Sequence, residues 1–348
     1  MNHPTGPEIE WNASLGIMRI LACVAVVILH TSARTIYLYG SIDEWDWQLA
    51  NFLNSSVRWC VPLFVMISGA LAFRAPILDT RTFLIDRSVR ILPPLAFWTI
   101  AYLAWRKYFL HENLTAAVVW NDIFAGQPYY HLYFLFLILG LYAFTPVLAP
   151  AIRNAPTLVA IRSSFAILVL SGVTIAFGSW SPIALTFFVP YIGYYALGAL
   201  LPNILMRAPT LLGIVLLGFS FGIATITTAV FTSLFVKHFA SVGGSALYFY
   251  TYFSPTVIIQ SVSIFVLLNS CKGGLLPRRV IRRLSDLVFG VYLIHPMILE
   301  SLRYIWQRTH PEMLTPALDM LVTSILVIAI STGLVAFIRT IRYCRNIV

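Results

Sequence analysis

The two residues best suited to chemistry in this sequence are Arg19 and His30, which lie at either end of its first strongly apolar segment. Ten uncharged residues separate them. On a helix that rises ~1.5 Å per residue, the two side chains lie about 16 Å apart along the axis, roughly half of a bilayer core. Ionisable groups at membrane depth are costly and mark candidate functional sites. The structural alternative is that Arg19 anchors the topology and that His30 is an interfacial histidine with satisfied hydrogen bonds.

The chain that must position these residues has 348 residues, of which 59% are hydrophobic and 10% are charged, with a mean hydropathy of +0.84. A soluble domain carries about 25% charged residues, so the composition predicts a polytopic membrane protein. The formal net charge of +10 does not indicate a nucleic-acid partner. The arginines stand between apolar runs, where they set the topology of the loops.

Apolar runs of about twenty residues predict an all-α membrane bundle of ten transmembrane helices. They lie at 14–34, 50–73, 91–110, 131–151, 163–179, 186–205, 210–235, 247–270, 285–305 and 317–338. With the amino terminus in the cytoplasm, most of the 23 Lys and Arg residues fall on the cytoplasmic side, as the positive-inside rule requires. Both termini are therefore predicted to be cytoplasmic, with Arg19 near the inner face and His30 in the outer half of the membrane.

Two more histidines are expected in the outer half of the membrane. His131 begins the span at 131–151, and His295 lies within the span at 285–305, five residues before Glu300. Each histidine alone is more often structural, but three on one side of a protein so poor in charge indicate a site. Because they lie on separate helices, no spacing argument supports a metal ion, and no metal site is predicted.

The segment after the second predicted span carries a candidate phosphate site. Arg87 and Arg90 are three residues apart, so they face the same way on a helix, and paired guanidinium groups suit phosphate contacts. The alternative is a topology signal. Just before them, Ser68 and Gly69 allow either close packing against a neighbouring helix or a gap through which a thin ligand arm passes.

These motifs together resemble the acyltransferase-3 family of integral membrane acyltransferases. The matching pieces are Arg19 with His30, the sequence Val-Pro-Leu-Phe-Val-Met-Ile-Ser-Gly at 61–69, Arg87 with Arg90, His-Leu-Tyr-Phe-Leu at 131–135, and Tyr-Leu-Ile-His-Pro at 292–296. Tyr133 stands where the family usually has Trp. Residues 17–32 and 54–58 are similar to the stand-alone O-acetyltransferases of the WecH type. The resemblance implies a single integral membrane acyltransferase domain over residues 1–348.

The resemblance also implies a reaction, namely the transfer of an acyl group, commonly acetyl, from cytoplasmic acyl-CoA to a hydroxyl of a cell-surface glycan. The acceptor would be a glycan such as enterobacterial common antigen, or a lipid-linked sugar, at the outer face of a bacterial inner membrane. Acetyl-CoA would act as cosubstrate, with no permanently bound cofactor.

The resemblance also assigns roles to the site residues. His30 and Arg19 are the predicted catalytic residues, and Arg87, Arg90, Ser68 and Gly69 are predicted to bind the acyl-CoA. His30 either deprotonates the acceptor hydroxyl or forms an acyl-histidine intermediate; the sequence leaves both open. His131, His295, Tyr133 and Glu300 are predicted to support His30 or to bind the sugar.

The main alternative function is a transporter or flippase for a glycan or a small solute. Such proteins often contain internal repeats with broken helices at matching positions, and residues 1–174 and 175–348 show no convincing repeat. The expected partners are acyl-CoA, the acceptor and membrane lipid, without nucleic acid, and self-association into a homo-oligomer is left open.

Overall fold

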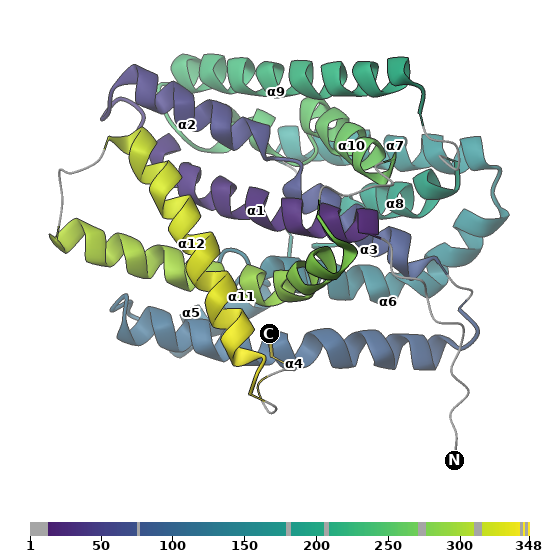
Figure 1. Ribbon diagram of the computed structural model, residues 1–348, viewed down its shortest axis with the longest axis horizontal. Coiled ribbons are helices and arrows are strands. Elements are labelled where there is room, and N and C mark those ends of the chain that lie inside the picture. The colour runs from purple at the N-terminus through teal and green to yellow at the C-terminus, as the bar shows by residue number, and fades with distance from the viewer. Residues whose placement is uncertain are drawn as a thin grey trace.

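The computed structural model of the protein describes residues 13–74, 77–178, 182–204, 209–270, 276–309, 315–341, 344 and 347–348. The described chain is built of helices (Figure 1). In chain order they are α1 (Ala13–Ile36), α2 (Glu44–Ser56), α3 (Cys60–Ala72), α4 (Thr80–Tyr108), α5 (Ala116–Phe124), α6 (Tyr133–Asn154), α7 (Thr157–Ala176), η1 (Val189–Tyr191), α8 (Ile192–Ile204), α9 (Leu211–Phe239), η2 (Gly244–Tyr250), α10 (Pro255–Ser270), α11 (Arg278–Thr309) and α12 (Pro316–Ile338), where η marks a 3₁₀ helix.

Eight helical segments in the described residues are long and apolar enough to cross a membrane. Each predicted span contains a helix, so the all-α membrane bundle is confirmed. The count of ten is not confirmed, because the predicted spans 91–110 and 186–205 correspond to α4 and α8, which are not among the eight. The helix α4 carries charged residues near both ends, and α8 has 13 residues, which at ~1.5 Å per residue are too few for a ~30 Å core.

Two of the membrane spans are interrupted, and the interruptions lie side by side. One span, Glu44–Ala72, consists of α2 and α3 and breaks at residues 57–59; the other, Gly244–Ser270, consists of η2 and α10. Arg58 in the first break donates from Nη1 to the carbonyl oxygen of Tyr250 in the second span at 3.1 Å. Non-helical backbone at membrane depth needs partners inside the protein, and Arg58 supplies one.

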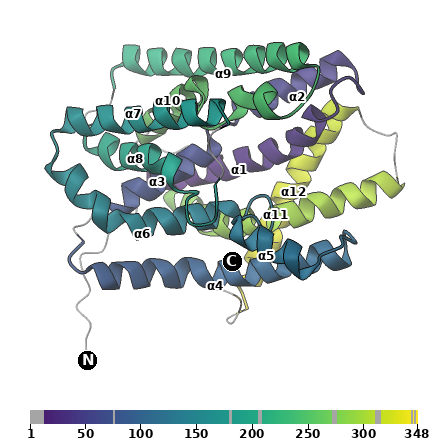
Figure 2. The same cartoon turned by 180° about the vertical axis from the view of Figure 1, so that it is seen from behind.

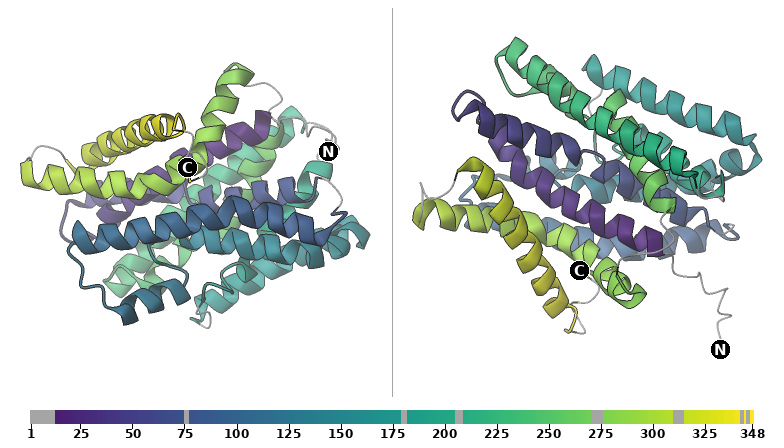
Figure 3. Two further views of the ribbon diagram at one scale, coloured as in Figure 1. Left: turned by 90° about the horizontal axis from the view of Figure 1, so that it is seen from below. Right: turned by 45° about the horizontal axis from the view of Figure 1, so that its top comes forward.

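The helix α1 lies at the centre of the bundle, where it contacts α2, α3, α10, α11 and α12. In Figure 1 it runs between α9 at the upper edge and α4 at the lower edge, while α12 crosses the front of the bundle at an angle. Seen from behind, α6, α7 and α8 cover the opposite side (Figure 2). From below, α4 runs along the whole face with α5 at one end (Figure 3, left). The middle of α1 is therefore surrounded by other helices.

The crossing of α3 and α8 depends on two glycines. A Cβ atom added to Gly69 would meet the carbonyl oxygen of Tyr195, and one added to Gly198 would meet the carbonyl oxygen of Met66, both closer than 3.0 Å. Small residues allow this approach of helix backbones in membrane proteins. Gly69 therefore lies in a helix contact, which is the close-packing role left open by the sequence.

We expect Gly198→Ala to lower the free energy of unfolding by about 1–3 kcal/mol, because the added methyl group would clash with the backbone of Met66 on α3. Thermal unfolding of the purified protein in detergent measures the effect. The matched control is Gly218→Ala on α9, where a Cβ atom meets nothing within 4 Å. Equal melting temperatures for the two variants would contradict the proposed crossing.

Candidate active site

The first cavity lies beside the amino-terminal part of α1 and has a volume of about 640 Å³. It is lined by residues of α1, α3, α4, α6 and α11 and by the segment after α3. Its charged and hydroxyl-bearing lining residues are Arg19, Ser68, Arg74, Asp86, Arg87, Arg90, Tyr142, Ser285, Asp286 and Tyr292. Four predicted residues, Arg19, Ser68, Arg87 and Arg90, thus come together in one cavity although they are far apart in sequence. We call it the inner cavity.

Three arginines of the inner cavity lack an ion-pair partner among the residues that the structure describes. Within the described residues, Arg19, Arg87 and Arg90 form no ion pair shorter than 4.0 Å. The guanidinium group of Arg87 instead lies over the rings of Phe83 and Tyr142, at 5.3 and 5.2 Å from their centroids. Stacking of this kind holds a guanidinium group in place and leaves its N–H donors available.

The helix α4, which carries Arg87 and Arg90, begins close to this cavity. Asp79 caps it by accepting from the backbone N–H groups of Arg81 and Thr82. Hydrogen bonds from the hydroxyl and the backbone of Thr82 lower the pKa of Asp79, so the carboxylate stays charged at the helix amino terminus, where negative charge is favoured.

The second cavity, which we call the outer cavity, lies beside the carboxyl-terminal part of α1 and has a volume of about 590 Å³. It is lined by His30, Ala33, Arg34, Tyr37, Gln127, Tyr130, Tyr133, Phe187, Tyr191, Tyr252, Glu300 and Arg303. The predicted residues His30, Tyr133 and Glu300 therefore share this cavity. The two cavities have no lining residue in common, and His30 lies eleven positions after Arg19 on α1, a rise of about 16 Å.

A chain of aromatic rings connects the two cavities. His30 lies 5.4 Å from His295 and 4.8 Å from Tyr130, measured between ring centroids. His295 lies 5.6 Å from His131, and Tyr292 packs against both of them at 5.9 and 5.4 Å. Because Tyr292 lines the inner cavity and His30 lines the outer one, the rings of Tyr292 and His295 lie between the two cavities.

Backbone carbonyl groups orient the two buried histidines of this chain. The Nδ1 atom of His295 lies 2.7 Å from the carbonyl oxygen of Tyr292, and Nε2 of His131 lies 3.2 Å from that of Leu293. A carbonyl only accepts, so in each neutral ring this nitrogen carries the proton. The other nitrogens, Nε2 of His295 and Nδ1 of His131, are buried acceptors without a protein partner in the described residues.

The His30 ring is held differently. It is half-buried, and no side chain or backbone group in the described residues donates to or accepts from its nitrogens. Instead, Nη2 of Arg303 donates to the carbonyl oxygen of His30 at 3.2 Å, while Nη1 of Arg303 lies 3.1 Å from the Glu300 carboxylate. The nitrogens of His30 are thus available to a molecule in the outer cavity.

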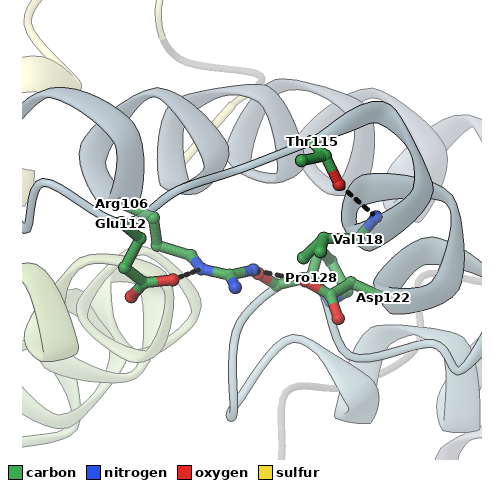
Figure 4. A network of polar contacts seen from close by, with 6 residues as sticks. All are labelled: Arg106, Glu112, Thr115, Val118, Asp122 and Pro128. Carbon is green, nitrogen blue, oxygen red and sulfur yellow. Dashed lines mark hydrogen bonds and ion pairs between the residues drawn. The ribbon is translucent and has the colours of Figure 1, made fainter.

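An ion-pair network fixes the segment that carries Tyr130 and His131. Arg106 at the end of α4 pairs with Glu112 at 2.8 Å and with Asp122 at 2.6 Å, and it donates to the carbonyl oxygen of Pro128 at 3.0 Å (Figure 4). Thr115 caps α5 in the same region by accepting from the backbone N–H of Val118. Pro128 stands three residues before His131, so this network sets the start of α6.

The structure gathers most of the predicted residues in two cavities, but three of their neighbours were not identified from the sequence. Tyr292 and Arg303 line the cavities and Arg58 lies behind the outer one, yet none of them was singled out. Two of the three had a local signal, because Tyr292 precedes His295 by three residues and Arg303 follows Glu300 by three, so each pair shares a helix face. For Arg58 the four-residue spacing from Asn54 was not enough, since Tyr250 and the Leu29 contact of Asn54 come from distant segments. Gly69 does not line either cavity.

We expect the two cavities to be reached from opposite sides of the membrane. In a variant whose native cysteines are replaced by serine, Ala33→Cys should react with a membrane-impermeant maleimide in intact cells. Ser68→Cys should react only in inverted membrane vesicles, and coenzyme A should protect it. Labelling of Ser68→Cys in intact cells would contradict the cytoplasmic placement of the termini; the cysteine-free protein is the control.

The residues of both cavities lie within a stretch that matches a known protein family. A family model described as an acyltransferase domain matches residues 12–336, nearly the whole chain. Curated proteins and solved structures gave no match, so the likeness to the WecH type stays a prediction. The matched stretch contains every residue that lines the inner and outer cavities. The chain belongs to the acyltransferase-3 family of membrane acyltransferases.

Proposed function

We propose that this protein is an O-acyltransferase that moves acetyl from cytoplasmic acetyl-CoA to a hydroxyl of a cell-surface glycan, such as enterobacterial common antigen, at the outer face of a bacterial inner membrane. The observation that carries the proposal is the position of the two cavities at either end of α1. One presents arginines without acidic partners, and the other presents a histidine without a hydrogen-bond partner, within the described residues.

The inner cavity suits the nucleotide end of acetyl-CoA. Coenzyme A carries several phosphate charges, and guanidinium groups bind phosphate through paired hydrogen bonds. Arg19, Arg87 and Arg90 supply these donors in the proposed complex, and Ser68 adds a hydroxyl group. The aspartates Asp86 and Asp286 in the same cavity repel phosphate, so the phosphates should lie on the arginine side.

The pantetheine arm can reach His30 without moving any charge through the membrane. It is thin and uncharged, and the route past Tyr292 and His295 is lined by rings. The distance to cover is about 16 Å along α1. Only the neutral thioester then enters the apolar region, which avoids the cost of burying phosphate.

At His30 the proposed chemistry is direct transfer with general base catalysis. The acceptor hydroxyl gives its proton to a nitrogen of His30 while its oxygen bonds to the thioester carbonyl carbon. The tetrahedral oxyanion then collapses, the carbon–sulfur bond breaks, and the thiolate of coenzyme A takes the proton from His30. The rival route forms an acetyl-histidine on His30 first, which would release coenzyme A in the absence of acceptor.

The outer cavity suits a sugar. Tyr130, Tyr133 and Tyr191 offer ring faces, while Gln127 and Glu300 offer polar groups for hydroxyls. Faces of aromatic rings and a few placed polar groups are what a binding cavity needs to orient a small ligand. Tyr130 contacts the His30 ring, so a sugar stacked on it would hold a hydroxyl near the base.

We expect His30→Ala to abolish transfer, since the carboxylate of Glu300, which also lines the outer cavity, is held by Arg303. Cells lacking the gene are complemented with wild type or with the variant at matched membrane levels, and glycan O-acetyl esters are measured by mass spectrometry. The matched control is His238→Ala, an exposed histidine at the end of α9. Full acetylation by His30→Ala would refute the mechanism. If wild type adds no acyl group, the transporter or flippase reading is favoured.

Substitution of either Arg87 or Arg90 by alanine should raise KM for acetyl-CoA. Each lost charged hydrogen bond is worth about 1.5–3 kcal/mol, which corresponds to roughly 10- to 100-fold. Initial rates of acetyl transfer in inverted vesicles give KM and kcat separately. Arg162→Ala, at an exposed position on α7 outside both cavities, should leave KM unchanged. An unchanged KM in both cavity variants would place donor binding elsewhere.

A further inference from the structure

The turn of α1 that carries His30 is held from outside the helix on two sides. On one side, Nη2 of Arg303 donates to the carbonyl oxygens of His30 and Thr31 at 3.2 and 3.1 Å. On the other side, Nδ2 of Asn54 donates to the carbonyl oxygen of Leu29 at 3.0 Å and lies 2.8 Å from Oγ of Ser32. These four residues, 29–32, form one helical turn, so the backbone around His30 is fixed by side chains of α2 and α11.

Arg58 in turn determines how Asn54 is oriented. Asn54 is fully buried, and its Oδ1 accepts from the guanidinium group of Arg58. With Oδ1 facing Arg58, the amide must point its Nδ2 donors toward α1. Arg58 is itself held by the carbonyl oxygen of Tyr250 at 3.1 Å and by the Tyr250 ring, whose centroid lies 3.9 Å from the guanidinium carbon.

Arg58 lies at a position where a cation is costly in free energy. It lies in the break between α2 and α3, and within the described residues no carboxylate lies within 4.0 Å of it. By contrast, Arg106 pairs with Glu112 and Lys237 pairs with Glu44. A charged group kept at membrane depth without a counter-charge indicates a functional use.

The His30 ring needs such external support. In many enzymes a hydrogen-bonded carboxylate orients the catalytic imidazole, but the His30 ring nitrogens have no partner among the described residues. Its direction therefore depends on its backbone and on packing against Tyr130 and His295. Catalytic groups must be held within about 0.5 Å of the productive geometry, and a displacement of about 1 Å costs roughly 100-fold in rate.

We propose that Arg58 is a positioning residue for His30, acting through Asn54 on the turn 29–32, with Arg303 holding the same turn from the opposite side. This inference rests on the proposed function of His30. Arg58 does not line either cavity, so it touches neither acetyl-CoA nor the acceptor. Its contribution is confined to the direction in which His30 faces the outer cavity.

The test measures acetyl transfer from radiolabelled acetyl-CoA to the glycan of the host membrane fraction. We expect Arg58→Gln to lower kcat about 10- to 100-fold while KM for acetyl-CoA stays within about twofold. Asn54→Asp keeps the contact to Arg58 but loses both donors to α1, so it should lower kcat to a similar extent. Arg58→Lys, which keeps the charge but not the planar group, should also lose rate.

The double variant Arg58→Gln with Asn54→Asp decides whether the two residues act as one unit. Positioning through Asn54 predicts that the double variant is no slower than the worse single variant, because residues that share one network are not additive. If the two effects multiply, Arg58 acts independently of Asn54 and the inference is wrong. A parallel rise in KM and fall in melting temperature would equally overturn it in favour of a purely structural role.

Two controls separate this inference from the proposed function. Lys237→Gln removes an exposed outer cation that pairs with Glu44 and should leave kcat unchanged. An inactive His30→Ala together with a fully active Arg58→Gln would refute the positioning role alone. A fully active His30→Ala would refute the mechanism on which it rests.

Discussion

The packing of α1 against α11 is the interaction on which the rest of the site depends. The two helices run in the same direction, and Sγ of Cys23 lies 3.8 Å from the carbonyl oxygen of Val288 between them. In this register Arg19 shares the inner cavity with Asp286, and His30 lies against His295. A slip of one helical turn, about 5.4 Å, would separate the two rings. One helix contact therefore determines the composition of both cavities.

Cationic side chains and imidazole rings lie at different places along the contact between α1 and α11. Cations that can meet phosphate gather in the inner cavity, whereas the imidazole rings lie deeper, among tyrosines and carbonyl groups. In the proposed reaction, the charged part of the donor never leaves the inner cavity, and only a neutral thioester reaches the base. The broken spans at Arg58 and Tyr250 fit this arrangement, because irregular backbone in a membrane protein is tolerated only where the protein itself satisfies it.

Much of the arrangement could be predicted from the sequence where the relevant signal is local. The helical rise alone places Arg19 and His30 at two depths, and a three-residue spacing brings Arg87 and Arg90 to one face. The count of ten helices is not confirmed, because apolarity alone does not distinguish α8, which is short and buried, from a full span. Arg58 could not be found from its four-residue spacing to Asn54 alone, since its significance depends on Leu29 and Tyr250, which only folding brings close.

The aromatic rings between the two cavities also affect how well the membrane remains electrically insulated at this protein. Tyr292 packs against Phe64 and Phe134, with centroids 6.5 and 5.4 Å away, and these three rings stand between the inner cavity and the histidines. Many membranes store energy as a voltage, and a continuous water-filled path across one would dissipate that voltage. These rings place uncharged side chains between the two cavities, so in the proposed reaction the pantetheine arm would have to displace them to reach His30. The proposed transfer would then open the ring layer only around the bound donor, and an acyl group could cross without a lasting path for protons.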